Sequence, residues 1–222
     1  FGYSPLRTGV AFLPMIGALV ATAPTAGQFL LRRLGTRGVL ILGIGIEAAA
    51  FAFLSRIDVD SAYAAAVVPG LLILGVGIGL VMPVAFNSGT RGIPGPHVGL
   101  ASAVLTVSQQ IGASLGVALL ATYASRRVNM YVDEHAEQTK AQAMRALSQA
   151  QATPDSAAGQ SIIARFTAEL ADHAQISAYS GGFLLMACIL IAVGALLAGL
   201  TAPAALRRAR AALQARRSRR RD

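Results

Sequence analysis

The sequence predicts an all-α integral membrane protein with five transmembrane helices. Of its 222 residues 55% are hydrophobic and only 13% are charged, whereas soluble domains carry roughly a quarter of their residues as Asp, Glu, Lys or Arg. The charges are also absent from long stretches, which are 10–31, 61–90, 98–125, 174–206 and, apart from Glu47, 38–55. Apolar runs of about 18 residues or more can cross a bilayer. A lone segment in lipid must be a helix, because only a helix satisfies its own backbone groups.

The expected elements follow this charge pattern along the chain. The five transmembrane helices are predicted over residues 8–31, 38–55, 63–88, 98–124 and 177–202. The polar region 125–176 is predicted to be an external loop with two helices, Met130–Gln151 and Gly159–Ala174, joined by a turn at Thr153–Ser156. Residues 203–222 form a basic tail.

The arginines predict how the chain is oriented in the membrane. Short loops rich in Lys and Arg stay on the cytoplasmic side. The loop between the first two helices contains Arg32, Arg33 and Arg37, and Gly35 permits a tight reversal there. The next loop carries acids, and the tail holds eight arginines and one acid. We therefore expect a multi-pass protein of the cytoplasmic (inner) membrane, with its N-terminus outside and its C-terminus inside.

The basic tail has two interpretations. A run such as "RRARAALQARRSRRRD" is compatible with nucleic-acid binding. Its position directly after a membrane helix favours contact with anionic lipid instead, since each base there contributes about 1 kcal/mol of attraction. We therefore expect membrane lipids as partners and no nucleic acid.

Motifs of catalysis or metal binding are missing from the sequence. Cys188 is the only cysteine, and the three histidines, His97, His135 and His173, lie far apart and are expected to form no cluster. The sequence contains no Walker loop, no HExxH and no GxSxG. We therefore expect no enzyme, no catalytic residue and no metal site.

Four segments together resemble a known transporter family. They are "FGYSPLRTGVAFLP", "GQFLLRRLGTRGVL", "PGLLILGVGIGLVMP" and "GLASAVLTVSQQIGASLGVALLAT". In order and spacing they resemble the C-terminal half of a major facilitator superfamily transporter, and more narrowly the fourteen-helix drug:proton antiporters. The resemblance implies that the five helices form most of one half-bundle. It also implies a small amphipathic substrate, the proton gradient as energy source with no cofactor, and a missing N-terminal half in the same or a separate chain.

The arginine-rich loop matches the superfamily's loop pattern only in part. Arg33, Gly35 and Arg37 fit that pattern, whereas Gln28 stands where it has its first glycine and Arg32 where it has an aspartate. The resemblance gives that aspartate a gating contact, so its replacement by Arg32 favours a topology signal and turn over a gate.

Glu47 is the only acid inside a predicted span and lies near mid-depth. A carboxylate there is costly to ionise and marks a proton or cationic-substrate site, unless it merely hydrogen-bonds a neighbouring helix. Gln109, Gln110 and Asn87 are polar groups that could line a cavity. Pro83 could form a hinge, and Met82 and Phe86 could form flexible apolar walls, although core packing explains these two at least as well.

Two functions remain open from the sequence. The first is the C-terminal portion of a proton-coupled secondary transporter that exports amphipathic drugs or other small molecules across the cytoplasmic membrane. The second is a truncated or split membrane protein that does not transport, and that anchors or assembles with a separate N-terminal half. The odd helix number and a chain that starts at Phe1 suggest a segment upstream.

Overall fold

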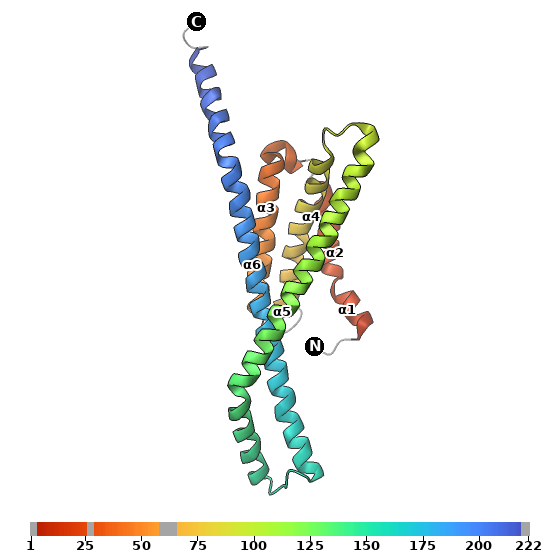
Figure 1. The fold of residues 1–222 in the computed structure, drawn as a ribbon, viewed down its shortest axis with the longest axis vertical. Helices are drawn as coiled ribbons and strands as arrows, with labels where there is room; N and C mark the ends of the chain where they lie inside the picture. Colours follow the sequence, from red (N-terminus) through yellow and green to blue (C-terminus); the bar gives the residue numbers. More distant parts are fainter. Residues whose placement is uncertain (1–3, 26–28, 58–65, 219–222) are drawn as a thin grey trace. The chain divides into compact units, whose positions relative to one another are not determined.

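The computed structural model describes residues 4–25, 29–57 and 66–218, and the side chains of most of these up to residue 200 (Figure 1). The chain forms two compact units. The first comprises residues 1–51, 68–102 and 186–222, and the second comprises 52–67 and 103–185. Gln28 and the two acids of the second predicted loop, Asp58 and Asp60, lie outside the described residues.

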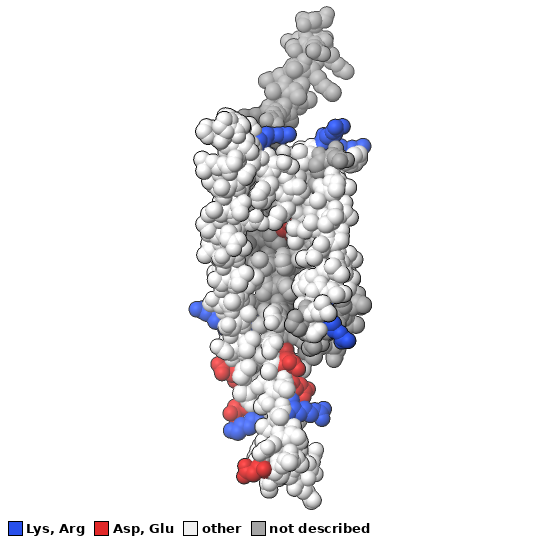
Figure 2. Space-filling model, turned by 90° about the vertical axis from the view of Figure 1, so that its right-hand side faces the viewer, with Lys and Arg blue, Asp and Glu red and all other residues white. Residues whose placement is uncertain are grey.

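The described residues form helices and no strand. The helices are α1 (Pro5–Ala11), α2 (Leu13–Thr25), α3 (Leu31–Leu54), α4 (Val68–Thr90), α5 (Gly95–Gln149) and α6 (Ala157–Ser218). Among the described residues five segments are long and apolar enough to cross a membrane: Leu6–Thr25, Leu31–Leu54, Val68–Thr90 and parts of Gly95–Gln149 and Ala157–Leu200. The expected all-helical fold with five such helices is confirmed. On the face shown in Figure 2, broad areas carry no Lys, Arg, Asp or Glu.

The N-terminal part departs from the single helix expected over 8–31. The side chain of Ser4 accepts a hydrogen bond from the amide of Arg7 (3.4 Å) and so caps α1. The α1 helix ends at Ala11 with Phe12 as its C-cap, and α2 begins at Leu13.

The expected loop at 32–37 is also different, because it is helical on both sides of one residue. Gly35 has φ +67° and ψ 171° within the range of α3. This left-handed backbone is open to glycine at little steric cost. The helix is therefore kinked at Gly35, and α3 includes all six residues expected in the loop.

The fourth and fifth predicted spans are each continuous with one of the two helices predicted in the polar region 125–176. The ranges 98–124 and 130–151 are joined within α5, and 159–174 and 177–202 are joined within α6. The change from apolar to polar sequence at residue 125 therefore does not end a helix.

In the first unit, α4 packs closely against both α2 and α3 (Figure 1). On the α2 side, a side chain at Gly75 would meet the carbonyl oxygen of Met15, and one at Gly79 would lie 2.8 Å from that of Leu19. On the α3 side, a side chain at Gly77 would lie 3.1 Å from the carbonyl oxygen of Gly43. Small residues allow this approach of backbones, which supplies the van der Waals contact that holds helices together in lipid.

The buried core of this unit lies between α3 and α4. Val39, Leu80 and Val84 are almost fully buried and form one cluster. Partly buried apolar side chains surround it: Leu30, Leu31, Leu40, Ile46 and Val76. This contact fixes the register of α3 against α4, and with it the position of Glu47.

In the second unit, α5 and α6 form an antiparallel hairpin (Figure 1). The amide of Ala152 bonds the carbonyl of Leu147 (3.1 Å) and that of Gln151 bonds Ser148 (3.2 Å), which is a Schellman end for α5. Gln151 occupies the left-handed position with φ +50°. The α6 helix starts where the side chain of Ser156 accepts a hydrogen bond from the amide of Gly159 (3.0 Å).

Small residues also line the contact of the two hairpin helices. Ala143, Ala174, Ala178 and Gly182 are among the buried ones. A side chain at Gly181 would lie 2.7 Å from the hydroxyl oxygen of Tyr123. The two helices of the hairpin therefore pack against each other. The end of α5 and the start of α6 are both capped by hydrogen bonds from within the hairpin.

We expect Gly75→Ala to destabilise the first unit by about 1–3 kcal/mol, because the new methyl group would fall on the backbone carbonyl of Met15. Gly45→Ala is the matched control, since nothing lies within 4 Å of a Cβ at Gly45. Equilibrium unfolding in mixed micelles measures both. Equal stability of the two variants would contradict the close α2–α4 contact.

Gln151→Gly should stabilise the hairpin by about 0.5–1 kcal/mol, because glycine adopts the left-handed conformation without the steric penalty that glutamine bears. Gln149→Gly, two residues earlier within α5, should have the opposite effect through its poor helix propensity. Amide hydrogen exchange over residues 131–173 reports both changes. Slower exchange in the control, or faster exchange in Gln151→Gly, would contradict the proposed end of α5.

Candidate functional site

Glu47 lies where α3 contacts α4. Its side chain is half-buried, and a Cβ at Gly77 would lie 2.5 Å from the Cγ of Glu47. The missing side chain of Gly77 thus makes room for the acid. Glu47 is the only acidic residue of α3, and α4 has none. The structure places this carboxyl group at a helix contact, with part of its surface still accessible.

The arginines of α3 are too far along the helix to pair with Glu47. Arg32, Arg33 and Arg37 are exposed, and the guanidinium of Arg33 lies 4.6 Å from the centre of the Phe29 ring. Ten residues separate Arg37 from Glu47, which corresponds to about 15 Å of helix, or half of the hydrocarbon thickness. The acid therefore lies near mid-depth if these arginines lie at the membrane surface.

The four candidates on α4 lie near Val84, the last buried residue of that helix. Met82 and Asn87 are exposed, and Pro83 and Phe86 are half-buried. Pro83 has no amide hydrogen, so the carbonyl of Gly79 receives no bond from it along the helix. Five residues after Pro83, the hydroxyl of Ser88 donates a hydrogen bond to the carbonyl of Val84 (2.6 Å). The α4 helix therefore lacks one backbone hydrogen bond at Pro83, one turn after Gly79, where it lies close to α2.

Gln109 and Gln110 are exposed on α5 within the second unit. Successive helical residues point about 100° apart, so the two side chains occupy different faces. Gln109 shares helical spacing with Thr106 and Gly116, a polar face with small residues. Gln110 lies next to the apolar and strongly exposed Ile111. Of the two glutamines, Gln109 is the better placed to line a polar pathway.

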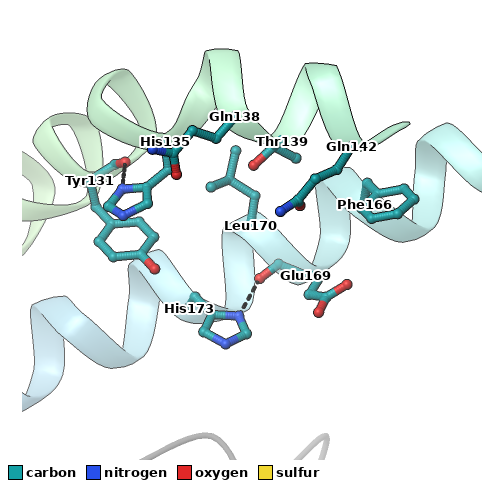
Figure 3. Close-up of a pocket in the computed structure, with 9 residues that line it drawn as sticks. All are labelled: Tyr131, His135, Gln138, Thr139, Gln142, Phe166, Glu169, Leu170 and His173. Carbon is teal, nitrogen blue, oxygen red and sulfur yellow. Dashed lines mark hydrogen bonds between the residues drawn. The ribbon is translucent and has the colours of Figure 1, made fainter. Parts of the chain in front are cut away.

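Sequence reasoning missed a pocket in the hairpin. Its volume is about 250 Å³. Figure 3 shows side chains from both helices around it: Tyr131, His135, Gln138, Thr139 and Gln142 from α5, and Phe166, Glu169, Leu170 and His173 from α6. His135 and His173 were expected to lie apart, and this expectation is wrong. Pro154 lies midway between them in the sequence, so a hairpin turn at this proline would have paired them.

Local hydrogen bonds orient the rings of this pocket. The rings of Tyr131 and His135 stack, with centroids 4.1 Å apart and an interplanar angle of 15°. Nδ1 of His135 donates to the carbonyl of Tyr131 (2.9 Å), and Nδ1 of His173 donates to that of Glu169 (2.8 Å). A carbonyl only accepts, so in the neutral rings Nε2 is the acceptor. Among the described residues no group of three or more His, Cys, Asp or Glu is placed to hold a metal ion.

A second, apolar pocket adjoins the first. Its volume is about 330 Å³. It is lined by Ala136, Thr139, Lys140, Ala143, Met144, Leu147, Pro154, Ile163, Phe166, Thr167 and Leu170. Thr139, Phe166 and Leu170 line both pockets. The hairpin therefore carries a polar pocket and a separate apolar pocket, with these three side chains in the lining of each.

Comparison with known proteins shows similarity to bacterial resistance and export proteins. The chain is 35% identical to a puromycin resistance protein of Streptomyces alboniger over 136 residues, which are 60% of this chain and 27% of that protein. It is 30% identical to a tetracenomycin C resistance and export protein of Streptomyces glaucescens over 137 residues, or 61% and 25% of the two chains. No protein-family model matches the chain.

A third relative matches more of the chain. It is a triacylglyceride transporter of Mycolicibacterium smegmatis, 29% identical over an alignment of 193 residues that covers 82% of this chain and 31% of the relative.

These relatives confirm the resemblance to drug-export proteins. Their names describe transport and resistance, and none of the three describes an enzyme. The matched regions span about a quarter to a third of the relatives' own length. Together with the five apolar helices, they make the chain a multi-pass membrane protein similar to bacterial drug exporters.

Proposed function

We propose that the chain is the C-terminal portion of a proton-coupled secondary transporter of the major facilitator superfamily, which exports amphipathic drugs or other small molecules. The observation that carries this proposal is the similarity to the puromycin and tetracenomycin C resistance proteins. The matched regions are only about a quarter of those proteins. The remaining half-bundle then belongs to the same polypeptide or to a separate one.

The arginines support an orientation in the cytoplasmic membrane. Arg32, Arg33 and Arg37 are exposed on α3 beside the kink at Gly35, where water or lipid phosphates can solvate them. With these residues and the basic C-terminal end inside, an odd number of crossings puts the N-terminus outside. Substrate would then leave on the side of the α5–α6 hairpin.

Glu47 is the group proposed to couple export to protons. An ionised carboxylate at mid-depth costs a few kcal/mol or more, so the empty site favours the protonated form. A cationic substrate would remove that penalty by pairing with the carboxylate. The exchange then balances: the carboxylic acid and the cation give the carboxylate–cation pair and one released proton. Gly77 supports this role because it lets the side chain of Glu47 lie at the α3–α4 contact while part of it stays accessible.

Each of the two units offers further polar or flexible side chains that suit a transport pathway. Gln109 lies on the small, polar face of α5, and Asn87 is exposed near the end of α4. Met82 is 42% exposed one residue before Pro83. Its flexible thioether suits substrates of varied shape. A pathway of this type lies between two half-bundles, which rock to expose it to either side in turn.

Glu47→Gln in the complete transporter should lower substrate-driven proton release about tenfold or more, because the amide cannot exchange a proton. Proteoliposomes with an internal pH dye, challenged with ethidium or puromycin, measure this release. Glu137→Gln is the matched control, since Glu137 is exposed on the hairpin outside the spans, and it should leave the release unchanged.

Two results would count against these proposals separately. Normal proton release by Glu47→Gln would exclude that residue as the coupling group and leave export intact. If the unaltered complete protein moves neither compound and releases no protons, the export function itself is wrong for these substrates and the non-transporting alternative gains support.

A further inference from the structure

The polar pocket of the α5–α6 hairpin is not used by the export pathway proposed above. It lies wholly within the second unit, and residues from both helices line it (Figure 3). We propose that this pocket binds one neutral sugar ring of the pyranose type. Binding there is separable from the passage of substrate and protons through the spans.

The pocket has an inner wall and an exposed rim. Five lining residues are half-buried and form the inner wall: Tyr131, His135, Thr139, Phe166 and Leu170. Four are exposed and polar and form the rim: Gln138, Gln142, Glu169 and His173. The volume is about 250 Å³, slightly below the usual range for drug-sized ligands, roughly 300–1,000 Å³. The pocket therefore has room for one small ring with its substituents.

The rim offers hydrogen-bond donors as well as acceptors. The amides of Gln138 and Gln142 each supply two N–H donors and a carbonyl oxygen, and Glu169 supplies a carboxylate. The side chains of these three residues make no hydrogen bond or ion pair with another described residue. Because Nδ1–H of each histidine is bonded to a backbone carbonyl, Nε2 is a further acceptor in the neutral rings. A sugar hydroxyl both donates and accepts, so a ring of hydroxyls can use this mixed set.

These groups approach the pocket from two helices (Figure 3). Gln138 and Gln142 are four residues apart on α5, and Glu169 and His173 are four residues apart on α6. Residues at this spacing are neighbours on one helix face, with Cβ atoms about 5–6 Å apart. Hydrogen bonds can therefore reach the edge of a bound ring from both sides.

Two aromatic rings supply the apolar contact that a sugar also uses. Tyr131 lies at one end of the pocket beside His135, and Phe166 lies at the other end (Figure 3). The ring of His135 stacks on that of Tyr131 at 4.1 Å and so orients it. An aromatic face is negative and attracts the weakly positive hydrogens of C–H groups. A pyranose carries such C–H groups on its ring faces and hydroxyls around its edge, which matches the combination of rings and rim.

The same lining disfavours charged ligands. Glu169 is the one carboxylate among the nine lining residues and none of them is Lys or Arg, so an anion such as phosphate is repelled. An organic cation donates hydrogen bonds and accepts none, so it would leave the N–H donors of Gln138 and Gln142 without a partner in the ligand. A neutral ring of hydroxyls uses the donors and the acceptors together.

Saturation-transfer difference NMR on the 222-residue chain in nanodiscs of perdeuterated phosphatidylcholine tests this proposal. The probes are the methyl glycosides of glucose, mannose, galactose and N-acetylglucosamine, each titrated separately. We expect a saturable signal from at least one of them, with a dissociation constant of about 1 mM, as for a ligand of so few atoms. The signal should be strongest on the ring C–H protons, which contact the aromatic side chains. Empty nanodiscs give the background.

Variants assign the binding to the pocket. Gln142→Leu should weaken binding of that glycoside about five- to tenfold, because it removes the hydrogen bonds of the amide and leaves a side chain of similar size. Gln149→Leu is the matched control, since Gln149 is exposed on the same helix and lines neither pocket. Tyr131→Leu removes an aromatic ring and should weaken binding several-fold. Amide hydrogen exchange over residues 131–173 checks that each variant keeps the hairpin.

Competition separates a sugar site from a site for ions. Tetramethylammonium and inorganic phosphate should displace the bound glycoside at least about tenfold more weakly than the unlabelled glycoside does, because neither offers a ring of both donors and acceptors.

Three outcomes would overturn the proposal. If none of the four glycosides gives a saturable signal above that of empty nanodiscs, the pocket binds no pyranose. Equal effects of Gln142→Leu and Gln149→Leu would show that the glycoside binds elsewhere on the chain. Displacement by tetramethylammonium as strong as that by the glycoside would show a site for cations. The proton-release assay of the complete transporter is unaffected by any of these results.

Discussion

The first unit depends on the close approach of the α4 backbone to its two neighbours. Lipid tails are as apolar as the helix surfaces, so the hydrophobic effect gives little drive for helices to associate in a membrane. Contact between surfaces must supply it, and glycines on opposite sides of α4 allow that contact. Gly75 and Gly79 meet backbone carbonyls of α2, and Gly77 meets that of Gly43 on α3. The same contact fixes Glu47, because the space above Gly77 is where its side chain lies.

The glycine contacts also explain why so much apolar surface of this unit remains exposed. No residue of α2 is buried within the chain, and Val10, Leu13 and Val20 are each more than half exposed. Such surface is normal where lipid or further helices cover it. It agrees with a half-bundle whose other neighbours are the membrane and the rest of a transporter.

The sequence predicted the membrane spans well because the absence of charge is a strong physical requirement in lipid. It did not predict where helices end, since a helix needs a stop signal and not merely a change of polarity. Residues 125–149 contain neither Gly nor Pro, so α5 continues beyond its apolar part until Gln151 takes the left-handed conformation. The break after α1 lies just before Pro14, which has no amide hydrogen to continue the hydrogen bonds of a helix. Sequence reasoning did not use this signal and placed one helix there.

The candidate site was predictable in part for the same reason. Glu47 stood out because it is an acid in an apolar stretch, although its contact with Gly77 required the packing of two helices. His135, Glu169 and His173 did not stand out, because each lies in a polar segment where such residues are common. Only the hairpin turn near Pro154 brings them to one pocket.

The mass of the native product tests most directly whether the chain is part of an exporter. An antibody to residues 203–222, applied to membranes of the source cells, would detect the polypeptide that carries this C-terminal segment. The account predicts a band of more than twice the 22.8 kDa of this chain, or a band at this mass that co-purifies with a second multi-pass protein. A single band at 22.8 kDa with no such partner would contradict it.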